Sequence, residues 1–383
     1  MTQQESVRVE IPGRSASGYD VVIERGGIGR IGELCERHLS AQAYALISDS
    51  RVAELYGQRA LEGLRTTGRR ADAFIFTAGE WNKTRQSWSE LSDAMLAEGF
   101  GRDAAVVALG GGVTGDLAGF VASTFKRGVP VVQVPTTVLA MVDSSVGGKT
   151  GVDTQEAKNA IGTFHHPSLV LVDPELLTTL APFQRVAGLA ESVKMAAMRD
   201  AELFDWIMSV SSGLRGGDLD RLTELVERSI RLKAEVISAD PEERGLRAIL
   251  NFGHTAGHAL ESLSGYSILH GEAVAQGMRL ESRMGEQLGL SEKGTAARLD
   301  AALGACGLPL EVNSGFPAES ILDAARSDKK ARAGILRWSV PSRIGSPARS
   351  PDDGYTHAIE RSECIAALDS ALRTASEVPD SEA

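Results

Sequence analysis

The chain has 383 residues, of which 43% are hydrophobic, and its formal net charge is −11. This length predicts one very large or two ordinary domains with a sizeable core, and the charge argues against nucleic acid or an anionic membrane as a bulk partner. Three widely spaced cysteines predict reduced thiols in a cytoplasmic protein, without disulfides or a cysteine-based zinc site. We expect neither a signal peptide nor a membrane span, because no segment has either pattern.

Short apolar runs alternate with helical patterns through the first half of the chain. Trp88, Leu91 and Met95 have helical spacing, and Gly99 is a plausible helix end. The runs that indicate buried strands are 44–48, 73–76, 104–109, 131–134 and 169–172. Strands alternating with helices predict a largely parallel sheet covered on both faces, with ligands at the carboxyl ends of the strands.

A glycine-rich turn follows the predicted strand 104–109. Residues 110–115 have the pattern GxGxxG before a predicted helix, so the backbone there could approach a pyrophosphate. The acidic partner expected about 20 residues later is absent, and Asp49 and Glu80 are upstream alternatives for binding a ribose. The glycines could instead serve only packing or a turn, and Lys83 beside Glu80 could be a surface pair.

A second loop, 142–151, carries Lys149 directly after two glycines, which suits an anion. It is not a Walker A loop, because Asp143 stands where that motif needs its earlier glycine. This argues against a nucleotide triphosphatase. The pair Lys158–Asn159 fits binding of a polar ligand or, alternatively, a solvated loop.

The strand pattern stops after Pro182, and helical patterns dominate the rest. We therefore expect domains at 1–182 and 183–373 and a disordered tail at 374–383. Glu191 and Lys194 are three residues apart and share a helix face. Lys233 lies on an apolar helical stripe, so it either extends its ammonium to water or faces a polar site.

Three of the seven histidines fall between residues 254 and 270. His254 and His258 are four apart on a predicted helix, so they share one face. His270 opens another helical run, where the helix dipole disfavours imidazolium and leaves a neutral nitrogen for a metal. Two histidines and a carboxylate are a common zinc-binding set. The alternative is that these histidines face solvent or are satisfied within the core.

Taken together, these motifs resemble those of the 3-dehydroquinate synthases, within the wider sugar-phosphate cyclases. The matching stretches are 110–120, 126–128, 135–137, 142–152, 158–159, 188–194, 245–254, 270–274 and 328–330. The resemblance implies an N-terminal α/β dinucleotide-binding domain with a mostly parallel sheet, and an all-α C-terminal domain that binds metal and substrate. It also implies a homodimer.

The implied reaction converts 3-deoxy-D-arabino-heptulosonate 7-phosphate into 3-dehydroquinate and phosphate. NAD oxidises a ring hydroxyl that Zn²⁺ (or Co²⁺) polarises, phosphate is eliminated, the hydride returns, and ring opening and an aldol step follow. NAD is therefore not consumed. The implied metal ligands are Glu191, His254 and His270, with His258 turned toward the substrate.

The resemblance also assigns the other site residues. Those implied to line the substrate are Asp143, Lys149, Asn159, Lys194, Lys233, Arg247, Asn251 and His258, with Lys149, Asn159 and His258 at the phosphate end beside Lys329 or Lys330. Glu243 would relay a proton or position a residue that contacts the substrate. Arg127 would reach the substrate of a neighbouring subunit. Those implied to hold NAD are Asp49, Glu80, Lys83, Gly111, Gly112, Asp116, Thr136, Thr137, Lys158 and Thr179.

Some positions depart from the family's commoner pattern. Phe125 replaces a tyrosine, His165–His166 replace an aromatic and a glutamine, and Met195–Ala196 replace Tyr-Gly. These departures leave room for another cyclase, of the aminodehydroquinate or valiolone type. A metal-dependent polyol dehydrogenase, which would release NADH, is a second alternative, and a non-catalytic binding module is a third.

Overall fold

The computed structural model describes residues 4–12, 18–154, 158–311, 315–327, 336–352 and 354–376. The chain forms two compact units, one comprising Met1–Leu180 with Leu222–Pro241, the other Ala181–Arg221 with Glu242–Ala383. Sequence analysis placed 222–241 in the second domain, whereas the structure groups it with the first unit. The predicted tail 374–383 overlaps the end of the last helix at 374–376 and otherwise lies outside the described residues.

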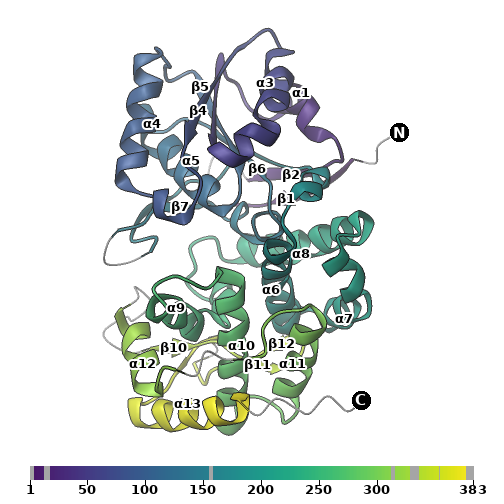
Figure 1. The fold of residues 1–383 in the computed structure, drawn as a ribbon, viewed down its shortest axis with the longest axis vertical. Coiled ribbons are helices and arrows are strands. Elements are labelled where there is room, and N and C mark those ends of the chain that lie inside the picture. Colours follow the sequence, from purple (N-terminus) through teal and green to yellow (C-terminus); the bar gives the residue numbers. More distant parts are fainter. Residues whose placement is uncertain are drawn as a thin grey trace. The chain divides into compact units, whose positions relative to one another are not determined.

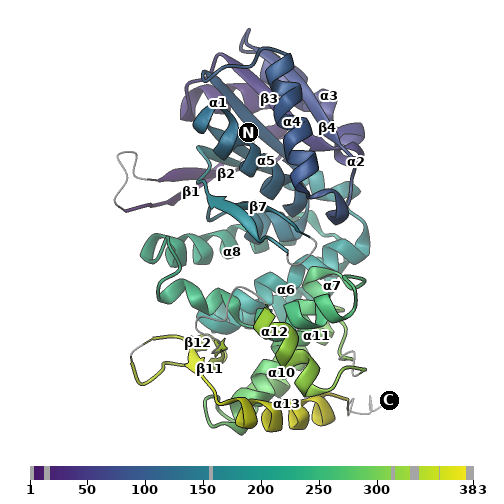
Figure 2. The ribbon, with the colours of Figure 1, turned by 90° about the vertical axis from the view of Figure 1, so that its left-hand side faces the viewer.

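The first unit is built on a seven-stranded sheet with the order β1-β2-β9-β6-β5-β3-β4. Figure 1 labels β1, β2, β4, β5 and β6 of this sheet. Its strands are β1 (Glu5–Val9), β2 (Tyr19–Ile23), β3 (Ala43–Asp49), β4 (Arg70–Phe76), β5 (Ala104–Gly110), β6 (Val131–Pro135) and β9 (Leu169–Val172). β1 pairs antiparallel with β2 at the edge of the sheet (Figure 2), and the other pairs are parallel. The predicted parallel sheet and its five predicted strands are confirmed.

Helices cover this sheet, and β7 (Lys149–Val152) and β8 (Ile161–Phe164) form a separate antiparallel hairpin. The helices of the first unit are α1 (Ile31–His38), α2 (Ser50–Val52), α3 (Gln58–Arg65), α4 (Arg85–Ala97), α5 (Gly112–Thr124) and most of α8 (Leu219–Ala239). α4, α5 and β5 pack together around a core that includes Leu91 of α4, Val106 of β5 and Leu117 of α5. This core therefore packs α4 and α5 against the strands of the sheet.

Contacts made by α8 explain why it joins the first unit. Ser238 Oγ accepts a hydrogen bond from the Glu10 amide at 3.0 Å, and Arg25 donates to Thr223 Oγ1 at 3.1 Å. Lys233, on the apolar face of α8, also bonds within this unit. These partners are far away in the sequence, so the composition of the segment did not reveal them.

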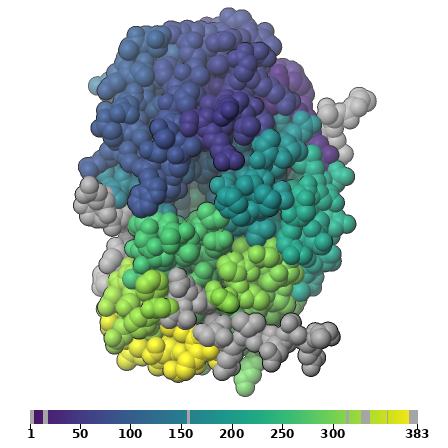
Figure 3. Space-filling model, viewed as in Figure 1, coloured from purple at the N-terminus to yellow at the C-terminus, as the bar shows by residue number. Residues whose placement is uncertain are grey.

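The second unit is helical, with two short antiparallel strand pairs, β10–β13 and β11–β12. Its elements are α6 (Pro182–Arg199), α7 (Ala201–Gly216), α9 (His254–Leu263), α10 (His270–Gln287), α11 (Thr295–Ala305), α12 (Ala318–Ser327), β10 (Arg337–Trp338), β11 (Pro341–Arg343), β12 (Ser346–Pro347), β13 (His357–Ala358) and α13 (Arg361–Ser376). Leu260, Leu280, Trp338 and Leu368 belong to a core that α9, α10, α12 and α13 share. α13, yellow in Figure 3, lies at the surface.

No helix among the described residues is both long and apolar enough to cross a bilayer. Cys35, Cys306 and Cys364 are free thiols, and all three are buried. Burial raises the pKa of each thiol to about 12, so these side chains are inert packing groups at neutral pH.

Candidate functional site

The carboxyl edge of the first unit's sheet gathers most of the residues predicted to hold NAD. β3 ends at Asp49, and one carboxylate oxygen of Asp49 accepts from the amides of Arg51 and Val52, both at 3.0 Å. Its other oxygen accepts from Thr114 Oγ1 at 3.2 Å. Asp49 thereby caps α2 and fastens that helix to the start of α5.

The glycine turn between β5 and α5 leaves the helix start without a side-chain cap. Gly111 precedes α5 in an extended conformation, and a Cβ on Gly111 would lie 3.1 Å from a Thr137 methyl. A Cβ on Gly112 would lie 3.2 Å from Ser144 Oγ. The Thr136 amide donates to the Gly110 carbonyl at 2.9 Å. The turn is therefore packed closely, and its first helical amides suit an anion.

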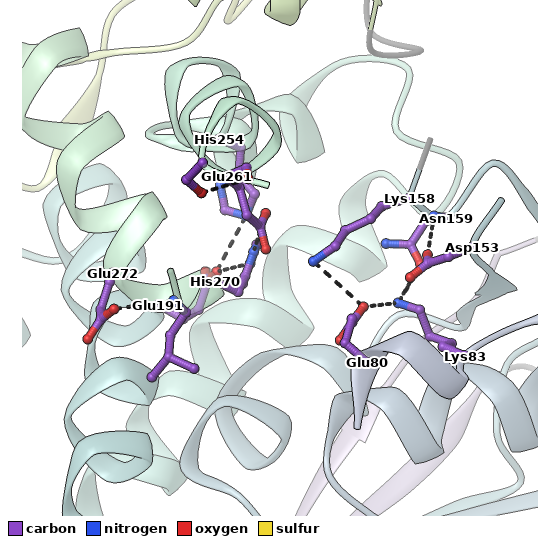
Figure 4. A network of polar contacts seen from close by, with 12 residues as sticks. Glu80, Lys83, Asp153, Lys158, Asn159, Glu191, His254, Glu261, His270 and Glu272 are labelled. Carbon is purple, nitrogen blue, oxygen red and sulfur yellow. Dashed lines mark hydrogen bonds and ion pairs between the residues drawn. The ribbon is translucent and has the colours of Figure 1, made fainter. Parts of the chain in front are cut away.

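Lys83 is a buried lysine at the centre of a cluster of charged side chains (Figure 4). It is 3% exposed, and its Nζ lies 2.8 Å from Glu80, 3.4 Å from Asp116 and 3.5 Å from Asp153. Asn159 Oδ1 accepts from the same ammonium at 2.9 Å, although Asn159 was predicted to bind the substrate's phosphate. Lys83 is therefore a buried ion-pair centre, and the surface-pair alternative is wrong.

Burial and charge oppose one another in this cluster. Burial alone would lower the pKa of Lys83, but the Asp116, Glu80 and Asp153 carboxylates outweigh it and raise that pKa. Burial raises the pKa of Asp116 to about 6, more than Lys83 lowers it. Burial also raises the pKa of Asp153. The cluster therefore favours the charged forms of Lys83 and Glu80, whose pKa is lowered by the neighbouring lysines despite burial, and disfavours ionisation of Asp116 and Asp153.

Lys233 meets Asp143 in the same unit. Its Nζ donates to Asp143 Oδ1 at 2.6 Å and to the Asp143 carbonyl at 2.5 Å. The ammonium is 5% exposed, so the alternative in which it extends to water is wrong. Six residues after Asp143, Lys149 begins β7 and is exposed. The loop before it is held by Tyr19, whose hydroxyl accepts from the Gly147 amide at 2.9 Å.

In the second unit, Glu191 meets two of the predicted histidines. Its Oε1 lies 3.4 Å from Nε2 of His254 and 3.4 Å from Nε2 of His270, as Figure 4 marks. Glu191 lies within α6, whereas His254 and His270 are the first residues of α9 and α10. A Cβ on Gly271 would lie 1.9 Å from the Ala187 carbonyl, so only glycine lets α10 begin this close to α6.

The chemistry of this cluster fits a divalent metal. Glu191 is completely buried, and neither carboxylate oxygen has a hydrogen bond of normal geometry within the described residues. Burial would raise the pKa of Glu191, but the Lys194 ammonium and the imidazoles of His254 and His270 hold it well below the usual range. Burial would lower the pKa of His270, but Glu191 and Glu261 outweigh it and raise the pKa to about 9. This differs from the expectation that the helix dipole keeps the imidazole neutral, because the two carboxylates have the larger effect. A carboxylate that meets two imidazoles is a common zinc-binding set, so these residues fit the metal.

His258 lies in the same cluster. His254, His258 and His270 each offer a ring nitrogen within 4.8 Å of the other two. Their ring centroids are 5.3 to 5.7 Å apart. The geometry therefore allows two ligand sets, three imidazoles or Glu191 with two of them.

The other predicted residues differ in their contacts and in their exposure. Asn251 Nδ2 donates to Glu243 Oε1 at 2.8 Å, and Arg247 is 3% exposed. Thr179 Oγ1 and the Tyr56 hydroxyl are 2.6 Å apart, and Lys158 Nζ lies 3.8 Å from Glu80. Arg127 is exposed with a φ of 71°. Lys329 and Lys330 lie outside the described residues.

Sequence reasoning missed two carboxylates in these clusters. Asp153 directly follows β7 and accepts from the Asn159 amide at 2.7 Å, in addition to facing Lys83. Glu261 Oε2 lies 3.6 Å from His270 Nδ1. Its signal was present in the sequence, because Glu261 is seven and three residues after His254 and His258 and shares their helix face.

Solved structures of similar fold define the class. The chain has a TM-score of 0.85 and 25% identity to a 2-deoxy-scyllo-inosose synthase complexed with carbaglucose-6-phosphate, NAD+ and Co2+, covering 96% of this chain and 99% of that one. It has a TM-score of 0.84 and 29% identity to a 2-epi-5-epi-valiolone synthase from Streptomyces hygroscopicus with NAD+ and Zn2+ bound, covering 95% and 99%. The predicted two-part architecture is confirmed, and it is that of the sugar-phosphate cyclases.

The family follows from the sequence comparisons. Residues 73–186 match the 3-dehydroquinate synthase N-terminal family model, and 188–331 match the C-terminal one. The chain is 44% identical over 337 residues to a 3-dehydroquinate synthase of Symbiobacterium thermophilum, covering 87% of this chain and 94% of that protein. The chain belongs to the 3-dehydroquinate synthase family.

Proposed function

We propose that this enzyme converts 3-deoxy-D-arabino-heptulosonate 7-phosphate into 3-dehydroquinate and phosphate. The observation that carries the proposal is the buried Glu191 carboxylate, which meets two imidazoles and the Lys194 ammonium in a chain that matches both 3-dehydroquinate synthase family models. The substrate class is a phosphorylated sugar, in keeping with the family. NAD, when bound, would supply the reversible oxidation that makes phosphate elimination possible.

For the metal we propose Glu191, His254 and His270 as ligands, with His258 left for the substrate. The distances support this choice, because Glu191 Oε1 is equally close to the two proposed imidazoles. A zinc or cobalt ion, when bound, would act as a Lewis acid on the reacting hydroxyl. Glu261 would bind Nδ1 of His270 and so keep Nε2 of that ring turned toward the ion.

For NAD we propose the carboxyl edge of the sheet, with the pyrophosphate at the uncapped start of α5. The pyrophosphate would be lined by Gly111, Gly112 and the Thr136–Thr137 turn. The other polar groups of NAD would bind to Asp49, Glu80, Lys83, Asp116, Lys158 and Thr179. The Lys83 cluster supports this assignment, since strongly shifted pKa values such as that of Asp116 gather at functional sites.

For the phosphorylated acid we propose the cationic and carboxamide groups that the resemblance assigns to the substrate. Lys149, Asn159, Lys194, Lys233, Arg247, Asn251 and His258 would bind its phosphate, carboxylate and hydroxyls. Asp143 would hold the Lys233 ammonium in place, as their 2.6 Å contact does in this structure. Glu243, which accepts from Asn251, would position that amide or pass on a proton.

We also propose a homodimer in which Arg127 reaches the neighbouring subunit's substrate. The exposed side chain and the strained backbone at Arg127 support a role outside its own subunit. Mixing inactive Arg127→Ala with inactive Lys149→Ala protein would test it. Restored activity is expected, because a mixed dimer has one site with both groups; no recovery after subunit exchange would contradict the proposal.

The main experiment identifies the product. Purified protein is incubated with the heptulosonate phosphate, zinc and NAD, and 3-dehydroquinate and phosphate are measured. A matched heptulose 7-phosphate without the carboxylate serves as control, and we expect it to react far more slowly. Preference for the control would favour another cyclase of the valiolone type. NADH release from a simple polyol would favour the dehydrogenase.

A further inference from the structure

The helix that carries His254 begins without a cap of its own. α9 starts at His254, and the preceding Gly253 has a left-handed backbone (φ 77°) and no side chain to accept a hydrogen bond. The first amides of a helix need acceptors, and buried ones are costly without them. The acceptor here comes from another helix.

Glu281 of α10 accepts hydrogen bonds from two backbone amides at the start of α9. It is completely buried, its Oε2 accepts from the Gly253 amide at 2.7 Å, and its Oε1 accepts from the Ala256 amide at 2.9 Å. A carboxylate at a helix N-terminus is also favoured by the helix dipole. None of the roles described above uses Glu281.

One of these hydrogen bonds acts on a peptide group that touches His254. The Phe252 carbonyl, 3.2 Å from His254 Nδ1, belongs to the same peptide as the Gly253 amide. In a trans peptide the carbonyl and the N–H point in opposite directions. Holding the N–H on Glu281 therefore aims the carbonyl at Nδ1, which keeps the proton there and leaves Nε2 facing Glu191.

Backbone packing makes this arrangement rigid. A Cβ on Gly277 of α10 would lie 1.9 Å from the Gly253 carbonyl and 2.7 Å from the Gly257 amide. The two helices therefore touch backbone to backbone, one turn before Glu281 on α10. Because His270 opens α10 and His254 opens α9, the same contact fixes the separation of the two imidazoles.

We propose that Glu281 is a positioning residue for the metal centre: through the Phe252–Gly253 peptide it sets the tautomer and ring orientation of His254. The inference rests on the proposed metal site. Glu281 does not touch the ion, so its effect should appear in metal affinity and in ligand geometry rather than in the ligand count.

The test compares Glu281→Gln with a matched control on the same helix. Glu286, also on α10, caps α11 by accepting from the Ala296 amide at 2.7 Å, away from any proposed ligand. We expect E281Q to weaken zinc binding by metal-free protein about 10- to 100-fold and to change the visible spectrum of the cobalt-loaded form. E286Q should change neither. Zinc affinity is measured by competition with a chromogenic chelator.

Three outcomes would overturn the inference: E281Q zinc affinity within twofold of the parent, an unchanged cobalt spectrum, or an equal loss in E286Q. If E281Q does not fold, Glu281→Asp replaces it, because this variant keeps the charge on a shorter side chain. Its zinc affinity and cobalt spectrum are compared with those of E286Q, with the same expected results. His254→Ala separates this inference from the site itself. If H254A binds zinc normally, the proposed metal site fails; if only H254A loses zinc, the role of Glu281 alone fails.

Discussion

Asp116 is expected to cost the protein stability at neutral pH. Its pKa is raised from 3.8 to about 6, chiefly by burial, although Lys83 lies 3.4 Å away. A carboxyl with a raised pKa favours folding at low pH, and that contribution is lost as the pH rises from about 4 through 6. The shift corresponds to about 3 kcal/mol at pH 7.

Asp116→Asn keeps the shape of the side chain and removes the charge. We expect D116N to be more stable than the parent by up to about 3 kcal/mol at pH 7.5 and to match it near pH 4. It should also bind NAD more weakly, in keeping with a functional group that is retained at a cost in stability. The assay is urea unfolding of both proteins across this pH range, with NAD binding measured by titration.

Asp93→Asn provides the control, because Asp93 is an exposed carboxylate on α4. It removes the same formal charge, and we expect no pH-dependent gain. A D116N protein that is less stable than the parent at pH 7.5 would refute the reasoning. So would a difference between the two proteins that stays constant from pH 4 to 7.5.

Two further predictions concern single side chains. Lys149→Ala should abolish turnover while leaving NAD binding nearly intact. Tyr19→Phe removes the acceptor of the Gly147 amide, and the loss of about 1 kcal/mol of hydrogen bonding should raise KM several-fold. Unchanged steady-state kinetics in both variants would contradict the proposal that the loop 142–151 binds an anion. His254→Ala should lose zinc, whereas His258→Ala should keep zinc and lose substrate affinity, and metal analysis of the two purified variants decides between the ligand sets.

The sequence predicted five strands of the sheet because each of them contains a short apolar run. β5 and β9 are buried on both faces, so their composition alone indicates a parallel strand. β1 and β2 were not predicted. β1 is short and alternates buried with exposed residues, and it lies at the edge of the sheet, where burial gives only a weak signal.

The site was predictable where spacing along one helix or turn was enough. His254 and His258 share a face for that reason, and His270 was placed at a helix start by pattern alone. Contacts between distant segments were not predictable, because only tertiary packing creates them. Asn159 meets Lys83 across 76 residues, and Glu281 meets Gly253 across 28. The individual roles of the site residues therefore stay predictions that the variants above test.

Catalytic use of NAD is the central claim, and one measurement tests it most directly. Purified enzyme is supplied with zinc, the heptulosonate phosphate and NAD at a concentration far below that of substrate, while phosphate release and NADH absorbance are followed together. We expect many phosphates per NAD with no net accumulation of NADH. One NADH formed per turnover, with phosphate release stopping when NAD is exhausted, would contradict the claim and support a polyol dehydrogenase.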